Sequence, residues 1–227
     1  MIEYFNEDCM VGMARYPDKH FDLAIVDPPY GASDAIGIVN GKSHNAKRKD
    51  YQLFDNQKPP TEYFKELERV SKHQIIWGGN FFGLIGGYIC WHKHGTVFGE
   101  AELAYCSKMQ SIKIFDFAWN GMIQADMKNK EHRIHPTQKP VALYKWLLKN
   151  YAKQGDLILD THVGSASSLI ACHDMGFDAV GFELDPDYYK ESKQRLNDHM
   201  AQLRLTDIVT DVVAEQHEQL ELEELCL

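Results

Sequence analysis

The sequence predicts an α/β domain built on an open sheet, and two observations support this fold class. The first is an apolar run, Phe21 to Val26, that is long enough for one buried strand. It stops at Asp27-Pro28-Pro29-Tyr30, because proline lacks an N–H donor and has a fixed φ angle. The second is a strand-helix-strand pattern over residues 157–183 in which each strand ends at an acid. Ligands bind beyond the carboxyl ends of strands in open α/β sheets, so we expect chemistry or recognition there, although a plain strand-ending turn is the alternative.

The composition fits a globular enzyme. The chain has 227 residues, of which 44% are hydrophobic and 25% charged, enough for one α/β domain or a domain with a small appendage. No N-terminal segment has the order of a signal peptide, and the longest nearly apolar stretch, Phe81 to Trp91, is too short to cross a bilayer. We therefore expect a cytoplasmic protein with no membrane partner.

Cysteine and histidine spacing gives no sign of a metal centre. The five cysteines are scattered without a CxxC pair, which favours reduced thiols over a disulfide framework or a structural zinc. Four histidines have no Cys or carboxylate at a matching spacing, namely His92, His94, His132 and His135. We expect no metal.

The net charge of −9 is concentrated at the C-terminus. Residues 207–227 hold seven acids and no Lys or Arg, which leaves residues 1–206 close to neutral. Two basic runs in this body could contact nucleic-acid phosphates, with solvated loops as the alternative. The first run comprises Lys42, His44, Lys47, Arg48 and Lys49, and the second comprises Lys128, Lys130, His132 and Arg133.

In chain order, the first half predicts strands with two short helices between them. Residues 1–5 predict a strand, and a short helical piece runs to Tyr16 before the strand at Phe21. Residues 31–60 are polar, with three glycines, and are expected to form a mobile flap. Thr61 is expected to cap a helix through about Ser71. Further strands are expected at residues 74–77, 88–91, 102–106 and 112–117.

The second half predicts alternating helices and strands. A helix from Val141 to Tyr151 is expected to be closed by Gly155. The strand-helix-strand unit follows, with strands at 157–159 and 179–182 and a helix at 165–175. Asp185 is expected to cap the last helix, with Pro186 at its first position.

This unit suits a ligand that contains a nucleoside. A small residue at the first turn lets a ligand approach the helix N-terminus, and an acid about 20 residues further on can accept hydrogen bonds from ribose hydroxyls. Glu183 stands 23 residues after Asp160. The turn, Gly164-Ser165-Ala166, lacks the GxGxxG pattern that cradles a pyrophosphate, so S-adenosylmethionine fits better than NAD or FAD. An ordinary crossover without a ligand is the alternative.

Five motifs in one order resemble the DNA amino-methyltransferases, and they cover nearly the whole chain to about residue 200. They are Asp27-Pro28-Pro29-Tyr30; Trp77-Gly78-Gly79-Asn80; Trp91-His92-Lys93 with Glu102-Leu103-Ala104-Tyr105; His135-Pro136-Thr137-Gln138-Lys139-Pro140; and Asp160 to Ser165 with Glu183. The catalytic motif comes first and the cofactor motif last, which resembles the β arrangement. The wording from Asp160 to Ser165 resembles phage and prophage adenine methylases, whereas Thr161-His162 and Ala166 depart from the commoner Pro-Phe and Gly-Ser-Gly.

The resemblance implies a Rossmann-like methyltransferase sheet with a small target-recognition insertion and S-adenosylmethionine as cofactor. It implies that Asp8 and Cys9 touch the cofactor's adenine and that Glu183 binds its ribose. The remaining implied cofactor residues are Thr137 and Lys139, near the methionine carboxylate, and Asp160, Thr161, Gly164 and Ser165 of the cofactor motif. The implied catalytic residues are Asp27, Pro28, Pro29 and Tyr30.

The chemistry explains why a carboxylate and an aromatic ring stand together. Adenine's exocyclic amine is a poor nucleophile because its lone pair is delocalised into the ring. Hydrogen bonds from the amine to Asp27 and to the Pro28 carbonyl would favour a tetrahedral nitrogen and stabilise its developing positive charge. Tyr30 would stack on the base, which must be flipped out of the duplex.

We therefore predict a DNA methyltransferase that modifies the N6 amine of adenine in double-stranded DNA. The alternatives are cytosine-N4 methylation, methylation of RNA adenine or of a protein glutamine, and a catalytically dead DNA-binding regulator. A homodimer stays open, and the sequence names no partner endonuclease. We expect one methyltransferase domain, residues 1–206, followed by an acidic tail, 207–227. The domain divides into a catalytic half (1–110), a target-recognition region (about 111–133) and a cofactor-binding half (134–206).

Overall fold

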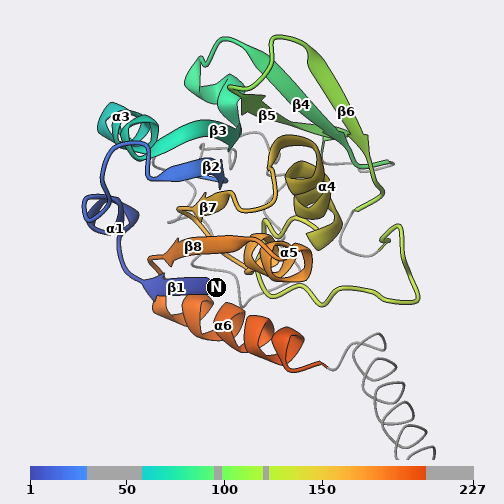
Figure 1. The fold of residues 1–227 in the computed structure, drawn as a ribbon. Coiled ribbons are helices and arrows are strands. Elements are labelled where there is room, and N and C mark those ends of the chain that lie inside the picture. Colours follow the sequence, from blue (N-terminus) through green and yellow to red (C-terminus); the bar gives the residue numbers. More distant parts are fainter. Residues whose placement is uncertain (30–57, 95–98, 120–122, 203–227) are drawn as a thin grey trace, which may run out of the picture.

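The structure is a computed structural model that describes residues 1–29, 58–94, 99–119 and 123–202. Its strands form one sheet in the order β1-β8-β7-β2-β3-β5-β4-β6 (Figure 1). The strands are β1 (Ile2–Asn6), β2 (Phe21–Val26), β3 (Ser71–Trp77), β4 (Gly87–His92), β5 (Ala101–Cys106), β6 (Ile112–Asp116), β7 (Leu157–Asp160) and β8 (Asp178–Glu183). The helices are α1 (Cys9–Met13), α3 (Thr61–Val70), α4 (Val141–Tyr151), α5 (Ser167–Met175) and α6 (Pro186–Met200), with a 3-10 turn, η2 (Gly79–Phe82).

Five neighbouring strands of the sheet are parallel. β1, β8, β7, β2 and β3 all run in one direction, so their carboxyl ends lie at one edge of the sheet. β5 is antiparallel to both β3 and β4, and β6 pairs parallel with β4. The functional side chains expected at strand ends therefore come together at one edge.

Helices cover both faces of the sheet, which makes three layers (Figure 1). Leu143 and Leu147 of α4 and Leu169 of α5 pack on one face, with Leu23 and Ile25 of β2. The other face carries α1 and α3, whose Met13, Tyr63 and Leu67 pack on Ala24, Val26 and Leu159. Because successive residues of a strand point to opposite faces, β2 is apolar at every position from Leu23 to Val26.

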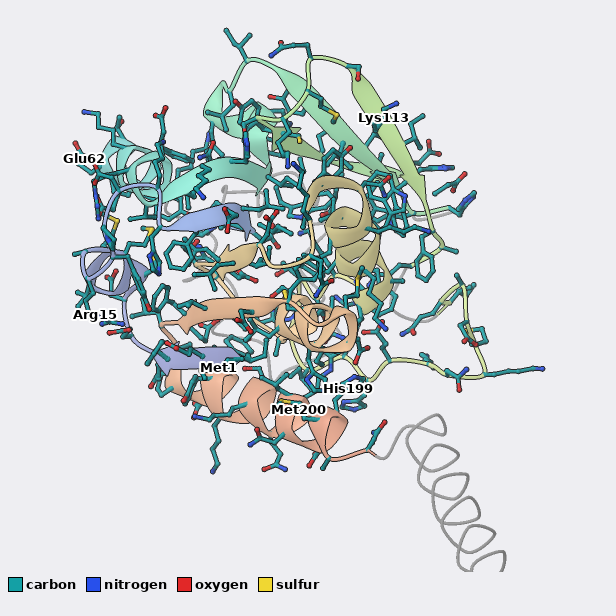
Figure 2. The ribbon with its side chains drawn as sticks, viewed as in Figure 1. Met1, Arg15, Glu62, Lys113, His199 and Met200 are labelled. Carbon is teal, nitrogen blue, oxygen red and sulfur yellow. The ribbon has the colours of Figure 1, made fainter. Side chains whose placement is uncertain are left out.

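Several charged side chains lie on the outside of these layers. Arg15, which follows α1, and Glu62 of α3 project from one helical layer, and Lys113 projects from the edge strand β6 (Figure 2). His199 and Met200 mark the C-terminal end of α6. No helix among the described residues is long and apolar enough to cross a membrane.

The predicted α/β fold and most of the predicted elements are confirmed, including the stop of β2 before the two prolines. Asp185 does cap α6, since its carboxylate accepts hydrogen bonds from the N–H groups of Asp187 and Tyr188. β3 begins three residues earlier than predicted, at Ser71, because it pairs there with Phe21 of β2. The local sequence pattern predicted the position of β3, whereas the pairing with β2 decided where it begins.

The predicted helix starts and ends need four corrections. The short helix α1 ends at Met13 rather than Tyr16, since the chain continues in 3-10-type turns towards Pro17. Thr61 is the first residue of α3 and does not cap it; Pro60 precedes it without a side-chain hydrogen bond. The helix α4 ends at Tyr151, so Gly155 does not close it, and Gly155 lies in the following turn with φ +91°.

The fourth correction concerns α5, which begins at Ser167 rather than Ser165. Ala166 precedes it in the left-handed conformation, with φ +63°, and this interrupts the helix that the sequence predicts there. The commoner family wording has glycine at this position, the residue that adopts positive φ without steric cost.

Some predictions concern residues outside the described ranges. These are Tyr30, residues 31–57 of the predicted flap, the first basic run from Lys42 to Lys49, and the acidic tail.

Candidate active site

The acids singled out in the sequence lie in a row along the carboxyl edge of the sheet. Asn6 at the end of β1 pairs with Glu183 of β8, which places Asp8 and Cys9 just beyond Glu183. Asp160 of β7 pairs with Gly181, next to the end of β8. Asp27 directly follows β2, the neighbour of β7. Four successive parallel strands thus deliver their acids to one edge.

The order of the strands reverses at the centre of this row. From β7 the chain proceeds through α5 to β8 on one side, and from β2 it proceeds to β3 on the other, with α3 directly before β3. In open α/β sheets the crevice at such a reversal is where ligands bind. Asp160 and Asp27 stand on its two sides.

Asp27 is held by a buried lysine. The Lys139 ammonium lies 2.6 Å from Asp27 Oδ2, and its side chain is 2% exposed against 15% for Asp27. The resemblance implied that Lys139 lies near the methionine carboxylate of the cofactor. In the described part of the chain, Lys139 forms ion pairs with Asp27 and Glu102. Lys139 stands in a turn before α4, where Gln138 holds the chain by bonding to the Ile134 N–H and the His132 carbonyl.

A second acid and a second lysine extend this contact. Lys139 Nζ lies 3.1 Å from Glu102 Oε2, and Glu102 Oε1 contacts the ammonium of Lys93. The charges therefore alternate from Asp27 to Lys93, and the four side chains together are neutral. We call Asp27, Lys139, Glu102 and Lys93 the charge chain.

Two tryptophans border the charge chain. Lys139 Nζ lies 5.1 Å from the ring centroid of Trp77, and Lys93 Nζ lies 5.2 Å from that of Trp91. The two rings, both fully buried, meet edge to face. Burial by itself raises the pKa of Glu102, but Lys139 and Lys93 outweigh it and hold that pKa below its usual range.

Asp160 is held by uncharged donors instead. Its Oδ1 accepts the His162 N–H at 3.0 Å, and its Oδ2 accepts the hydroxyl of Ser168 from α5. Burial raises the pKa of Asp160 to about 7, although these hydrogen bonds oppose the shift. A carboxyl group that titrates near neutrality therefore lies at the end of β7.

Glu183 ties the end of β8 to the turn after β7. Its Oε2 accepts the Gly164 N–H at 2.8 Å, and its Oε1 accepts the Asp185 N–H at 3.0 Å. Gly164 has φ +55°, a left-handed conformation that side chains disfavour. Burial raises the pKa of Glu183 above its usual range. Each of its oxygens keeps a second lone pair for a ligand hydroxyl.

Asp8 and Cys9 begin α1 beside this turn. The Asp8 carboxylate caps the helix by accepting the Met10 N–H at 2.7 Å. Burial raises the pKa of the Cys9 thiol to about 12, with Asp8 adding to the effect, so Cys9 is a protonated thiol. Burial lowers the pKa of His162 to about 4, and Asp8 acts against this shift from close by.

Thr161, His162 and Tyr63 form a hydrogen-bonded chain where the sequence departs from Pro-Phe. The Thr161 hydroxyl lies 2.6 Å from the Tyr63 hydroxyl and 2.9 Å from His162 Nδ1. The rings of Tyr63 and His162 meet edge to face. The departure therefore brings a hydroxyl that bonds to Tyr63 of α3 and an imidazole that bonds to this hydroxyl.

Two of the predicted cofactor residues have different degrees of exposure. Thr137 is exposed, and its hydroxyl lies 3.1 Å from His135 Nδ1. Ser165 is buried, and its backbone carbonyl accepts a hydrogen bond of 2.6 Å from Nη1 of Arg195. Arg195 also pairs with Glu131 at 2.8 Å, which ties α6 to the predicted target-recognition region.

The basic side chains of the second run lie on the surface. Lys128, Lys130 and Arg133 are exposed, in a segment that Asp126 turns by accepting the Lys128 and Asn129 N–H groups. Exposure leaves them accessible to a phosphate backbone, and their role in DNA binding stays a prediction.

The hydrogen-bond acceptors of the site fit S-adenosylmethionine. Among the described residues, no ion pair brings a lysine or arginine to Asp160 or Glu183, whose hydrogen-bond partners are backbone N–H groups and the Ser168 hydroxyl. The cofactor carries an ammonium, a sulfonium and ribose hydroxyls, which are the cations and donors that such acceptors suit. Glu183, Asp160 and the Gly164 turn are the residues that would hold it.

Sequence reasoning missed roles for Glu102, Lys93, Tyr63 and Arg195. Lys93 and Glu102 stood inside a quoted motif, but their spacing did not indicate that they meet. A usable signal was a charged residue within a strand with apolar neighbours, since such a residue needs a buried partner.

Comparisons with known proteins show what this chain is similar to. A family model described as DNA methylase matches residues 93–194. The type II methyltransferase M.HpaI of Haemophilus parainfluenzae is 35% identical over 217 residues, covering 79% of this chain and 69% of that protein. Two solved structures share the fold, each with a TM-score of 0.55. The M1.HpyAVI–SAM complex is 17% identical and matches 86% of this chain and 100% of that one. The cytosine-N4-specific PvuII DNA methyltransferase is 12% identical and matches 87% and 90%.

The likeness to the solved structures establishes the fold as Rossmann-like, and the match to M.HpaI extends over most of both proteins. The chain belongs to the N6/N4 family of DNA methylases and is an S-adenosylmethionine-dependent DNA methyltransferase.

Proposed function

We propose that the protein methylates the N6 amine of adenine at a specific site in double-stranded DNA, on a base flipped into the crevice between β7 and β2. The observation that carries this proposal is the position of Asp27 beside the acids of β7 and β8, at the point where the strand order reverses. This position suits a methyl donor on one side and the acceptor amine on the other.

The cofactor side of the crevice binds and orients. Glu183 accepts the ribose hydroxyls, Asp160 and the turn from Thr161 to Ser165 border the methionine part, and Asp8 and Cys9 border the adenine. Thr137 lies close to the methionine carboxylate. When bound, S-adenosylmethionine supplies an electrophilic methyl group on a sulfonium.

The acceptor side supplies hydrogen-bond acceptors. Asp27 and the Pro28 carbonyl accept the two amine protons, which localises the nitrogen lone pair and stabilises the positive charge that develops on it. Pro28 and Pro29 fix the direction of the chain after β2, and Tyr30 stacks on the flipped base. Lys139 keeps Asp27 ionised and in one orientation, and Glu102 and Lys93 fix Lys139 in turn.

The choice of adenine rests on the first residue of the motif. Asp27 occupies a position that resembles adenine methylases, whereas cytosine-N4 methylases more often have serine there. Aspartate carries a full negative charge, whereas serine has only a neutral hydroxyl. The negative charge suits an amine that becomes cationic during methyl transfer.

The DNA contacts belong to the same proposal. Residues 111–133 and the flap at 31–60 read the target, while exposed basic residues bind phosphates and set a steep salt dependence. The basic residues are Lys42, His44, Lys47, Arg48 and Lys49 in the flap and Lys128, Lys130 and Arg133 in the second run. Residues 1–110 and 134–206 form the catalytic and cofactor-binding halves of one domain.

The test is to express the protein in methylation-deficient bacteria and to analyse their DNA by modification-sensitive sequencing and nucleoside mass spectrometry. We expect N6-methyladenine in one sequence context, absent with Asp27→Ala. N4-methylcytosine would contradict the choice of base. Unmodified DNA from cells holding folded, cofactor-binding protein would contradict the proposal as a whole.

A further inference from the structure

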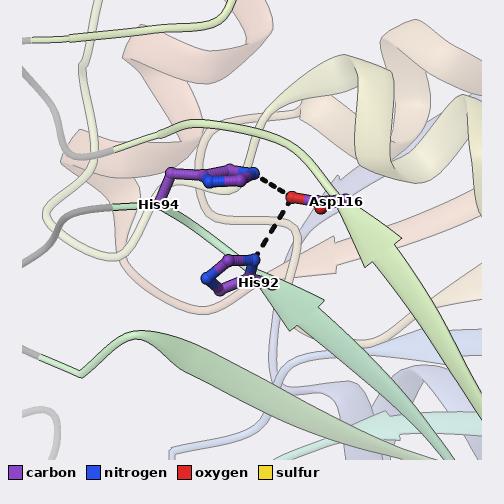
Figure 3. Close-up of side chains that lie close together, drawn as sticks. All are labelled: His92, His94 and Asp116. Carbon is purple, nitrogen blue, oxygen red and sulfur yellow. Dashed lines mark ion pairs between the residues drawn. The ribbon is translucent and has the colours of Figure 1, made fainter.

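A group of three side chains outside the charge chain has the composition of a metal site. His92 ends β4 and Asp116 ends β6, and these two residues stand opposite each other in the parallel pairing of the strands. His94 follows two residues after His92. Within the described residues, these three form the one group of at least three His, Cys, Asp or Glu ligand atoms close enough to share an ion (Figure 3).

The donor atoms converge on one carboxylate oxygen. His92 Nδ1 lies 3.3 Å from Asp116 Oδ1, and His94 Nε2 contacts the same oxygen. The two imidazole ring centroids are 4.2 Å apart, and Figure 3 shows both rings turned towards Asp116. All three ligand atoms lie within 4.8 Å of one another.

The backbone holds this arrangement. The Phe117 N–H bonds to the His92 carbonyl and the Trp119 N–H to the Lys93 carbonyl, so the chain after β6 is fastened to the chain after β4. His94 has φ +56°, a conformation that residues other than glycine seldom adopt. This turn brings its ring back over His92.

We infer that His92, His94 and Asp116 bind a divalent transition ion of the zinc type. Two imidazole nitrogens and one carboxylate oxygen are ligands that zinc prefers, and solvent completes the shell. Tetrahedral bonds of about 2.0 to 2.1 Å place neighbouring ligand atoms about 3.3 Å apart. The His92–Asp116 spacing has this value, at 3.3 Å. The side chains are 39%, 51% and 57% exposed, which leaves a path for the ion.

The sequence predicted no metal because Asp116 stands far from the two histidines along the chain. Only the pairing of β4 with β6 brings the carboxylate to them. The other two histidines that the sequence offered, His132 and His135, are not in the group.

The site would act on the enzyme through Lys93. This residue lies between the two histidines and contributes the outermost ammonium of the charge chain. An ion held by the residues on either side would fix the strand end that carries it. The position indicates a structural ion, because the three ligands do not belong to the crevice between β7 and β2.

The test uses the full chain without a histidine tag, freed of metal by chelation. Titration calorimetry with ZnCl₂ should give one ion per chain, and CoCl₂ should give the visible absorption of cobalt bound by nitrogen and oxygen. MgCl₂ should not compete, since magnesium prefers oxygen ligands. His94→Ala and Asp116→Asn should each weaken zinc binding at least tenfold.

His199→Ala is the matched control. His199 also contacts a carboxylate, Asp174, and its ring centroid lies 6.2 Å from that of His173, but among the described residues these side chains do not form a group of three ligand atoms close enough to share an ion. Its zinc affinity should equal that of the wild type. Zinc should raise the thermal midpoint of the wild type and of His199→Ala but not of Asp116→Asn. Absence of zinc binding, or binding that His94→Ala and Asp116→Asn leave unchanged, would overturn the proposal and reduce the group to histidine–aspartate ion pairs.

Discussion

The carboxylates on the two sides of the β7–β2 boundary are held in opposite ways. Asp160 and Glu183 accept hydrogen bonds from backbone N–H groups and from Ser168, and burial raises the pKa of both. Asp27 and Glu102 are paired with Lys139 and Lys93, and the lysines hold the pKa of Glu102 below its usual range.

This difference fits the charges of the two ligands. In the proposed function the sulfonium and ammonium of the cofactor bring positive charge towards Asp160, and its ribose hydroxyls donate hydrogen bonds to Glu183, so neither acid requires a fixed cation of the protein. In the proposed function the nucleobase is neutral, so Asp27, as the acceptor of its amine, must stay ionised when water is excluded. A buried lysine fulfils that requirement.

The largest expected effect is on catalysis by Asp27→Ala. Removing the acceptor of the amine should lower the rate of methyl transfer by about 10² to 10³, or about 3 to 4 kcal/mol, because the interaction strengthens in the transition state. Cofactor affinity should be unchanged. Tritiated methyl incorporation into DNA and calorimetry measure the two quantities, with Glu62→Ala, an exposed acid, as control. Methyl transfer at the wild-type rate would mean that Asp27 has no catalytic role and only ends the strand.

The next effect is on stability, through Lys139→Met. Without this cation the carboxylates of Asp27 and Glu102 are left close together and partly buried, so the free energy of unfolding should fall by about 2 to 3 kcal/mol. Urea unfolding measures it. In a background of Asp27→Asn and Glu102→Gln the same substitution should cost much less. An equal cost in both backgrounds would mean that Lys139 stabilises by packing alone.

A smaller effect concerns pH. Asp160 has a pKa of about 7 in the folded chain against an ordinary value of 3.8. Between these values the folded state keeps a proton that the unfolded state has released, so the contribution of Asp160 to stability falls as pH rises. The slope is about 1.4 kcal/mol per pH unit. The difference in unfolding free energy between wild type and Asp160→Asn should fall in this way from pH 5 to pH 7. A difference independent of pH would show that Asp160 is ionised throughout.

The smallest effect is on cofactor binding by Glu183→Gln. The amide keeps one acceptor but loses the charge, so the dissociation constant should rise roughly fivefold, or about 1 kcal/mol. The transfer rate at saturating cofactor should change little, because ribose contacts are similar in the ground and transition states. Glu191→Gln, on the exposed side of α6, is the control. A lower transfer rate at saturating cofactor, with unchanged cofactor affinity, would indicate that Glu183 acts on the base and not on the cofactor.

Much of the fold followed from the sequence because its causes are local. An apolar run ended by two prolines is a strand that must stop there, whatever surrounds it. Asp185 followed by Pro186 begins α6, since the cap and the fixed φ act within one turn. The motifs likewise indicated the cofactor and the family, because each consists of residues close together along the chain.

The contacts that distinguish the two sides of the site were decided by the tertiary structure. Lys139 reaches Asp27 across 112 residues, and Asp116 reaches His92 only because β6 pairs with β4. Ala166 takes a left-handed conformation that its own propensity disfavours, and this delays α5 by two residues. Local sequence sets the preference of each residue for its own backbone shape. Strand order and register set which distant charges meet, and these depend on the packing of the whole sheet.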